Sequence, residues 1–178
     1  MSDTHTISVL VENRPGVLAR ISGLFARRGF NIDSLAVGET HDPATARITI
    51  VLSSEGKPLE QVVKQLHKLI NVLRVIDLPE GEAVERELAL IKVAAEPAQR
   101  AEILGIAEVF RAKVVDVDAR SLVIEVTGGP GKVNALEELV RPYGVLELAR
   151  TGRVALQRGE RSLRAPSLQP VPVMQPAS

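Results

Sequence analysis

The residues with the clearest chemical potential lie in a short turn over residues 12–18, Glu-Asn-Arg-Pro-Gly-Val-Leu. Asn13 carries a carboxamide that can both donate and accept hydrogen bonds, and Gly16 allows close approach to the backbone. A helix that begins after Pro15 would present unpaired N–H groups at the positive end of its dipole, which suits a carboxylate. The turn therefore predicts a site for a small zwitterion such as a free amino acid.

A second carboxamide stands further along the chain, at Asn31. It is followed by Ile32, whose side chain could line a pocket for an aliphatic ligand group. Asn and Pro near a helix start are also ordinary capping and turn residues. The spacing alone therefore favours a purely structural role.

The elements that must position these residues follow one pattern twice. In the first half, strands are expected over 6–11, 35–37, 46–52 and 72–78, and helical faces over 17–25 and 59–70, with Gly29 ending the first helix. In the second half, strands are expected over 88–95, 114–118, 122–127 and 145–149, the last of which could continue through Val154 and Leu156, and helices over 103–110 and 130–140. Each half reads βαββαβ. This order predicts an α+β protein of two tandem ferredoxin-like domains, each a four-stranded antiparallel sheet with two helices on one face.

Breaks in this pattern suggest the domain limits. The breaker-rich stretch 79–82 predicts a first domain over 1–79, a linker over 80–84 and a second domain over 85–159. Residues 160–178 are rich in Pro, Ser, Ala and Gln, which is typical of a disordered tail. The apolar strands of the first half would make a bare outer sheet face costly, so we expect another sheet or subunit to cover it, and at least a dimer.

Composition disfavours several classes of function. Lys and Arg balance Asp and Glu at 22 each among 178 residues, and only three Phe and one Tyr could stack on bases, so nucleic acid is not an expected partner. The chain shows no signal peptide and no long apolar run, so a cytoplasmic protein without membrane contact is expected. Cys is absent, and His5, His41 and His67 lack paired spacing, so we predict neither a metal site nor catalytic residues.

Several segments carry a resemblance to a known family. Residues 12–18 and 28–35 resemble the ACT domain of acetolactate synthase small subunits. Residues 65–69, 72–75, 84–88 and 150–152 resemble the same family in order and approximate spacing. The resemblance extends from Thr6 to about Gly159.

The resemblance implies a regulatory subunit without catalytic activity of its own. Such a subunit would activate a catalytic large subunit in branched-chain amino acid biosynthesis and confer feedback inhibition, with thiamine diphosphate, Mg and FAD bound by the large subunit and no cofactor in this chain. The resemblance also implies a homodimer that binds its effector at the interface. One chain would contribute Asn13, Gly16, Val17 and Leu18, and the other Asn31 and Ile32. On chemical grounds, N–H groups over 16–18 would hold the carboxylate and the two asparagines the ammonium.

Alternatives remain at this stage. Valine and leucine differ by one methylene, worth only about 0.8 kcal/mol of burial, so valine is implied by the resemblance and not by the residues. A stand-alone amino-acid-sensing ACT protein that regulates another enzyme or transcription is the main rival. A transcription regulator should carry a DNA-binding arm, for which the residues before the first expected strand leave no room.

Overall fold

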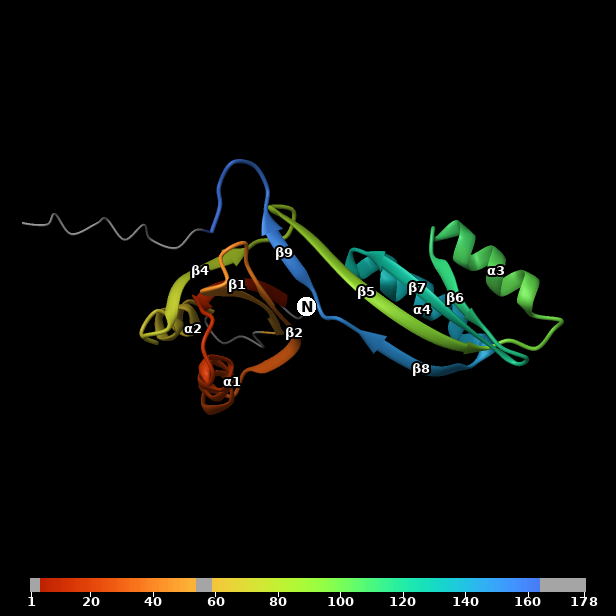
Figure 1. Ribbon diagram of the computed structural model, residues 1–178, viewed down its shortest axis with the longest axis horizontal. Helices are drawn as coiled ribbons and strands as arrows, with labels where there is room; N and C mark the ends of the chain where they lie inside the picture. The colour runs from red at the N-terminus through yellow and green to blue at the C-terminus, as the bar shows by residue number, and fades with distance from the viewer. Residues whose placement is uncertain (1–3, 54–58, 164–178) are drawn as a thin grey trace, which may run out of the picture.

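The computed structural model describes residues 4–53 and 59–163, which form two lobes with one long strand, β5, running from one into the other (Figure 1). The first lobe contains β1 (Thr4–Glu12), α1 (Val17–Arg28), β2 (Asn31–Glu39), β3 (Thr45–Ser53), α2 (Leu59–Leu66) and β4 (Val72–Leu78). The chain continues with β5 (Ala83–Ala94), α3 (Arg100–Val109), β6 (Lys113–Val117), β7 (Ser121–Gly128), α4 (Pro130–Val140), a 3-10 turn (Arg141–Tyr143), β8 (Val145–Arg150) and β9 (Val154–Gln157).

The first sheet has the strand order β2-β3-β1-β4, and its neighbouring strands are antiparallel. Alternate residues of β1 and β3 point to the helices, which gives paired rows such as Ile7 opposite Ile50 and Val9 opposite Ile48. These side chains form one core with the buried faces of α1 and α2, including Phe25 and Leu66, which are both 0% exposed. Both helices therefore cover the same face of the sheet.

The second sheet repeats this arrangement with the order β6-β7-β5-β8. Its core is separate from the first one and contains Ile91 from β5, Ile124 from β7, Ile103 from α3 and Leu136 from α4. The predicted fold class, two tandem βαββαβ domains, is thereby confirmed. The added strand β9, which pairs with β5, is a fifth strand that the prediction of two four-stranded sheets did not include.

Two predicted elements differ from the structure. The helix expected over 59–70 ends at Leu66, and Ile70 is 89% exposed in the turn that follows. The last strand, which could have continued through Val154 and Leu156, is divided into β8 and β9. Gly152 lies between them with φ +79°, a left-handed conformation that interrupts an extended strand.

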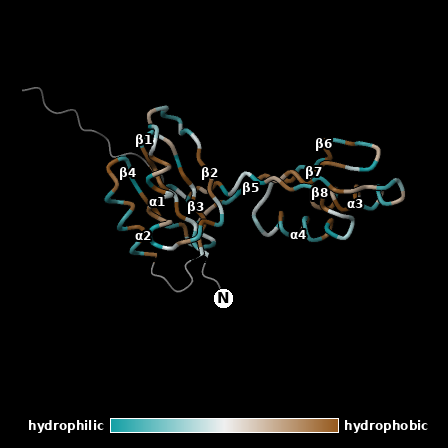
Figure 2. Tube along the Cα trace, turned by 90° about the horizontal axis from the view of Figure 1, so that it is seen from below, coloured by the Kyte–Doolittle hydropathy of each residue, from teal (hydrophilic) through white to brown (hydrophobic). Residues whose placement is uncertain are grey.

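The two domains meet through a two-stranded ribbon that consists of the first residues of β5 and all of β9. Residues 83–86 of β5 pair with 154–157 of β9, and Ala83 and Ala155 pack against Leu78 of β4. The molecule narrows where β5 passes between the lobes (Figure 2). The ribbon thus covers part of the helix-free face of the first sheet, a face that we expected another sheet or subunit to cover.

The structure also bears on the predicted domain limits. Residues 79–82 form the turn between β4 and β5, and β5 begins at Ala83, inside the predicted linker. Most of the predicted tail lies outside the described residues, whereas Leu163 is only 7% exposed. In the described part of the chain, no helix is both long and apolar enough to cross a membrane.

A hydrogen bond at the ribbon gives a first test of how the two domains are joined. Thr6 is 5% exposed, and its Oγ1 donates to Glu85 Oε1 at 2.7 Å. We expect Thr6→Val to lower the free energy of unfolding by about 1–2 kcal/mol, because the half-buried carboxylate loses a donor. Urea unfolding measures this, with Thr127→Val at an exposed strand position as the control. Equal losses in the two variants would contradict the prediction.

Candidate functional site

The turn between β1 and α1 is built around Gly16, which precedes the helix with φ +84°. No heavy atom lies within 4 Å of the position that a Cβ would occupy there, so the backbone is open to approach. Val17 is only 5% exposed and belongs to the first core, whereas Leu18 is 41% exposed. Val17 can therefore offer a ligand only its backbone, and Leu18 can also offer an aliphatic side chain.

The start of α1 leaves several N–H groups without acceptors. The N–H of Val17 makes a long 3.4 Å bond to the Arg14 carbonyl, and the first regular helical bond is Arg20 N–H to Gly16 O at 3.1 Å. Within residues 4–53 and 59–163, no acceptor is found for the N–H groups of Gly16, Leu18 and Ala19. The first turn also lacks an acidic residue, so no side chain of the helix itself neutralises this positive end.

Asn13 is exposed, and its side chain is oriented by two acceptors. Its Nδ2 donates to Glu39 Oε1 at 3.1 Å and to the Pro43 carbonyl at 3.0 Å. These bonds use the nitrogen end of the carboxamide and leave its oxygen without a donor among the described residues. Asn13 can therefore accept a hydrogen bond from a ligand.

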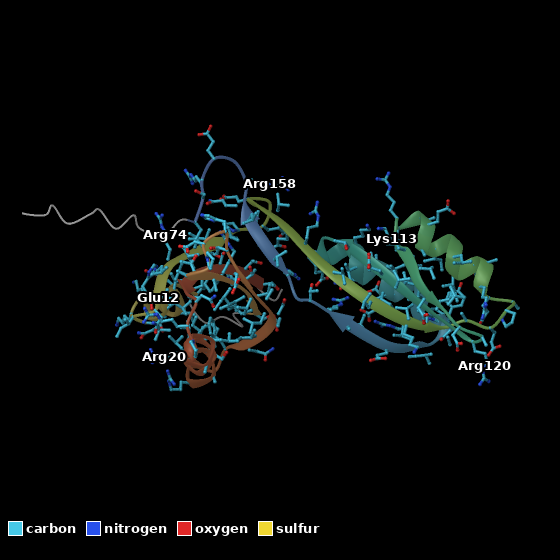
Figure 3. The ribbon with its side chains drawn as sticks, in the orientation of Figure 1. Glu12, Arg20, Arg74, Lys113, Arg120 and Arg158 are labelled. Atoms are coloured by element: carbon cyan, nitrogen blue, oxygen red, sulfur yellow. The ribbon has the colours of Figure 1, made fainter. Side chains whose placement is uncertain are left out.

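A side-chain network fixes the turn to the rest of the first domain. Asn71 donates to Glu12 Oε2 at 2.7 Å and accepts from Arg20 Nη1 at 2.8 Å, so it links the end of β1 to α1. Figure 3 shows Glu12 and Arg20 on the same side of the first domain. The loop is thus held from both ends before any ligand binds.

The second predicted pair of residues begins β2. Asn31 is exposed, and its Nδ2 donates to Asp33 Oδ1 at 2.9 Å, which again leaves the amide oxygen without a donor among the described residues. Asp33 Oδ2 accepts from Ser53 Oγ at 2.7 Å. Ile32 is half-buried against the first core. A register shift between Ile32 and Ser34 makes Asp33 the extra residue of a bulge.

One chain does not bring the two groups of predicted residues together. Glu12, next to Asn13, is paired with Thr45 at the start of β3, whereas Asn31 is paired with Ser53 at its end. Eight residues of strand separate these points by about 27 Å. Asn13 and Asn31 therefore cannot touch the same amino acid within one molecule.

The edge of the first sheet offers a way to bring the two groups of predicted residues together in a dimer. Among the described strands, β2 lies at the edge of the sheet and pairs only with β3, and Val37 on it is 50% exposed. An unpaired edge is a template for a further strand. If two copies paired their β2 strands antiparallel, Asn31 of one chain would lie opposite the Glu39 end of the other, where Glu39 holds Asn13.

A second concave region lies beside the ribbon. It is an open groove of about 520 Å³ between the ribbon and the outer side of β2 and β3, with Val84, Val154 and Leu156 on one wall and Arg47 on the other. Burial lowers the pKa of the Arg47 guanidinium, whose Nη1 donates to Ser8 Oγ at 3.1 Å. Among the described residues, no cluster of three or more His, Asp or Glu could hold a metal ion.

Sequence reasoning missed the side chains that orient the two asparagines, namely Glu39 and Asp33, and the bridging Asn71. Asp33 could have been found, because it stands only two residues after Asn31. Glu39 and Asn71 are 26 and 59 residues from their partners, so local spacing gives no signal for them.

Comparison with protein families defines the class of the molecule. A family model described as "AHAS small subunit-like ACT domain" matches residues 7–74. A second model, described as "Small subunit of acetolactate synthase", matches residues 86–159. The first domain is therefore an ACT domain.

Full-length relatives agree with both matches. The acetolactate synthase small subunit of Mycolicibacterium smegmatis is 55% identical over 162 residues, covering 91% of this chain and 95% of the relative. A probable acetolactate synthase small subunit of Archaeoglobus fulgidus is 55% identical over 157 residues, covering 88% and 98%. The crystal structure of the acetolactate synthase small subunit from Thermotoga maritima matches with a TM-score of 0.81 and 42% identity, covering 89% of this chain and 99% of that one. The chain belongs to the family of acetolactate synthase small subunits.

Proposed function

We propose that this chain is the regulatory subunit of a cytoplasmic acetolactate synthase, which activates a catalytic large subunit and makes it sensitive to feedback inhibition by valine. Family membership supports the regulatory role. Catalysis, with thiamine diphosphate, Mg and FAD, belongs to the large subunit in this proposal. The observation that carries the effector site is the set of N–H groups at the start of α1 that have no acceptor in the described part of the chain, together with the edge of β2, which no described strand pairs with.

The effector site is proposed to lie between two copies of the chain. A two-fold axis through antiparallel β2 strands would place Asn31 and Ile32 of one copy near Asn13 and residues 16–18 of the other. Within one chain the two groups lie at opposite ends of β3, so a second copy is needed to complete the site. The dimer then has two equivalent sites.

The free groups match the charges of an amino acid. The carboxylate would accept hydrogen bonds from the N–H groups of Gly16 and Leu18, at the positive end of α1. The ammonium would donate to the amide oxygens of Asn13 and Asn31, since both side chains already use their nitrogens elsewhere. Leu18 would contact the aliphatic side chain of the ligand.

A ligand held between two chains can regulate a third. It binds one arrangement of the dimer better than another, and that difference in affinity shifts the population of the two arrangements. A coupling free energy of about 1–3 kcal/mol would change the affinity between states by about 5- to 150-fold. This is enough to regulate the activity of the catalytic subunit.

Reconstitution tests the proposal. Purified small subunit alone should form no acetolactate from pyruvate, and adding the matching large subunit should give activity that valine inhibits. In calorimetry on the small subunit, we expect Asn13→Ala and Asn31→Ala each to weaken valine binding by about tenfold or more, because each removes one of the two acceptors proposed for the ligand ammonium. Asn134→Ala on α4 serves as the control. Turnover by the small subunit alone, or parental affinity in both site variants, would overturn the proposal.

A further inference from the structure

Residues 150–152, Arg-Thr-Gly, lie at the junction of β8 and β9 and are not among the residues proposed for the effector site. Arg150 holds the second domain: its Nη2 donates to Asn134 Oδ1 at 2.8 Å and to Glu137 Oε2 at 2.9 Å, both on α4. Thr151 holds β5, because its N–H donates to the Leu88 carbonyl at 3.0 Å and its Oγ1 accepts from the Leu88 N–H at 3.1 Å. The segment is thus anchored in the second domain by both residues.

The next two residues contact the first domain. Gly152 has φ +79°, and a Cβ there would lie 2.9 Å from both the Leu35 carbonyl oxygen and Ser34 Oγ on β2. Arg153 N–H donates to Ser34 Oγ at 2.9 Å, and its side chain lies 3.8 Å from Glu85. Only glycine satisfies both the backbone conformation and the close approach to β2.

The contact on β2 lies beside the predicted effector residues. Ser34 follows Asp33, the extra residue of the bulge, and Asp33 holds the side chain of Asn31. A bulge is a place where a strand can re-aim its side chains. A movement of the Asn31 side chain on ligand binding would therefore be passed to Ser34 through Ile32 and Asp33.

We propose that residues 150–153 form the joint through which effector occupancy at the start of β2 reaches the second domain, with Gly152 as its positioning residue. This inference rests on the proposed function. The joint has the connectivity that coupling requires, because one end is bonded to β2 and the other to β5 and α4. A shift of β2 that breaks or remakes the Arg153–Ser34 bond changes the position of the second domain relative to the first.

The test uses the complex of large and small subunits with Gly152→Ala in the small subunit. The added methyl collides with the backbone of β2, so the joint should separate from the strand while the effector residues remain in place. We expect valine to bind the variant within about threefold of the parent by calorimetry, while the coupling factor of about 5 to 150 collapses toward one and valine no longer inhibits the complex.

Two further variants make the result specific. Gly159→Ala has the same kind of backbone strain, φ +77°, but its Cβ would meet no atom within 4 Å, so its complex should keep valine inhibition. Ser34→Ala adds no atom and removes the acceptor of the Arg153 N–H, so it should weaken inhibition even if Gly152→Ala does not fold.

The outcomes separate this inference from the proposed function. If the parent small subunit does not bind valine, the proposed function is wrong, and the inference about residues 150–153 is wrong as well. If the parent binds valine and the Gly152→Ala or Ser34→Ala complex is inhibited like the parent, only the joint is wrong. Loss of valine binding in both variants would also overturn the joint, because these residues would then shape the effector site itself.

Discussion

Mixing the Asn13→Ala and Asn31→Ala variants should restore the high-affinity valine binding that neither variant shows alone. Each proposed site takes Asn13 from one chain and Asn31 from the other, so a mixed dimer contains one intact site and one site that lacks both side chains. Random exchange makes half of the dimers mixed, and we expect about one quarter of the parental number of high-affinity sites. Calorimetry after exchange of the two proteins measures this number.

The control is a mixture of the parent with a double variant that carries both substitutions on one chain. In that mixture the mixed dimers contain no intact site, so high-affinity binding comes from parental dimers alone. If the two single variants fail to restore binding although exchange is demonstrated, the site does not lie between two chains. That result would leave family membership intact and remove the proposed geometry.

The variant Arg150→Ala should lose about 3–5 kcal/mol of unfolding free energy, which is the usual cost of leaving a buried charge without its partner. Glu87 is 5% exposed, its Oε1 has no hydrogen-bond partner among the described residues, and the nearest cation is Arg150 Nη1 at 3.6 Å. Glu137 also loses a 2.9 Å ion pair in this variant. Urea unfolding at fixed protein concentration measures the loss.

Arg141→Ala is the matched control, because Arg141 also pairs with Glu137, at 3.0 Å, but is 65% exposed. We expect that variant to lose less than about 1 kcal/mol, as exposed ion pairs do. Adding Glu87→Gln to Arg150→Ala should recover part of the stability, because the buried charge is then absent. Equal losses in Arg150→Ala and Arg141→Ala would show that Glu87 does not depend on this arginine.

The fold could be predicted from the sequence because both cores follow simple periodicities. The alternation of residues along the first strand predicted that Ile7, Val9 and Val11 share one face of the sheet, and the register of β1 agrees. Gly29 ends α1 in the left-handed conformation, as expected. The prediction for α2 was too long because Leu69 and Ile70 continue the helical spacing after the backbone has already turned at Leu66. The spacing of apolar residues predicts which side chains share a helical face. It does not predict at which residue the helical backbone hydrogen bonds end.

The division between β8 and β9 depends on contacts that no local pattern contains. Gly152 takes its conformation at a close contact with Leu35, more than a hundred positions earlier in the chain. The same limit applies to the candidate site. The residue types indicated amino-acid chemistry at Asn13 and Asn31, but only the pairing along β3 shows that they lie at opposite ends of the sheet.

The length of β5 has a mechanical consequence. Every second residue from Ala83 to Val93 points to the same side, and that single row contacts the first sheet at its beginning and the helices of the second domain at its end. Inserting one residue midway would rotate the far half by about 180° and turn its apolar row toward water. β5 therefore fixes both the distance and the rotation between the two domains, and only changes of two residues in its length would keep the apolar row on one side.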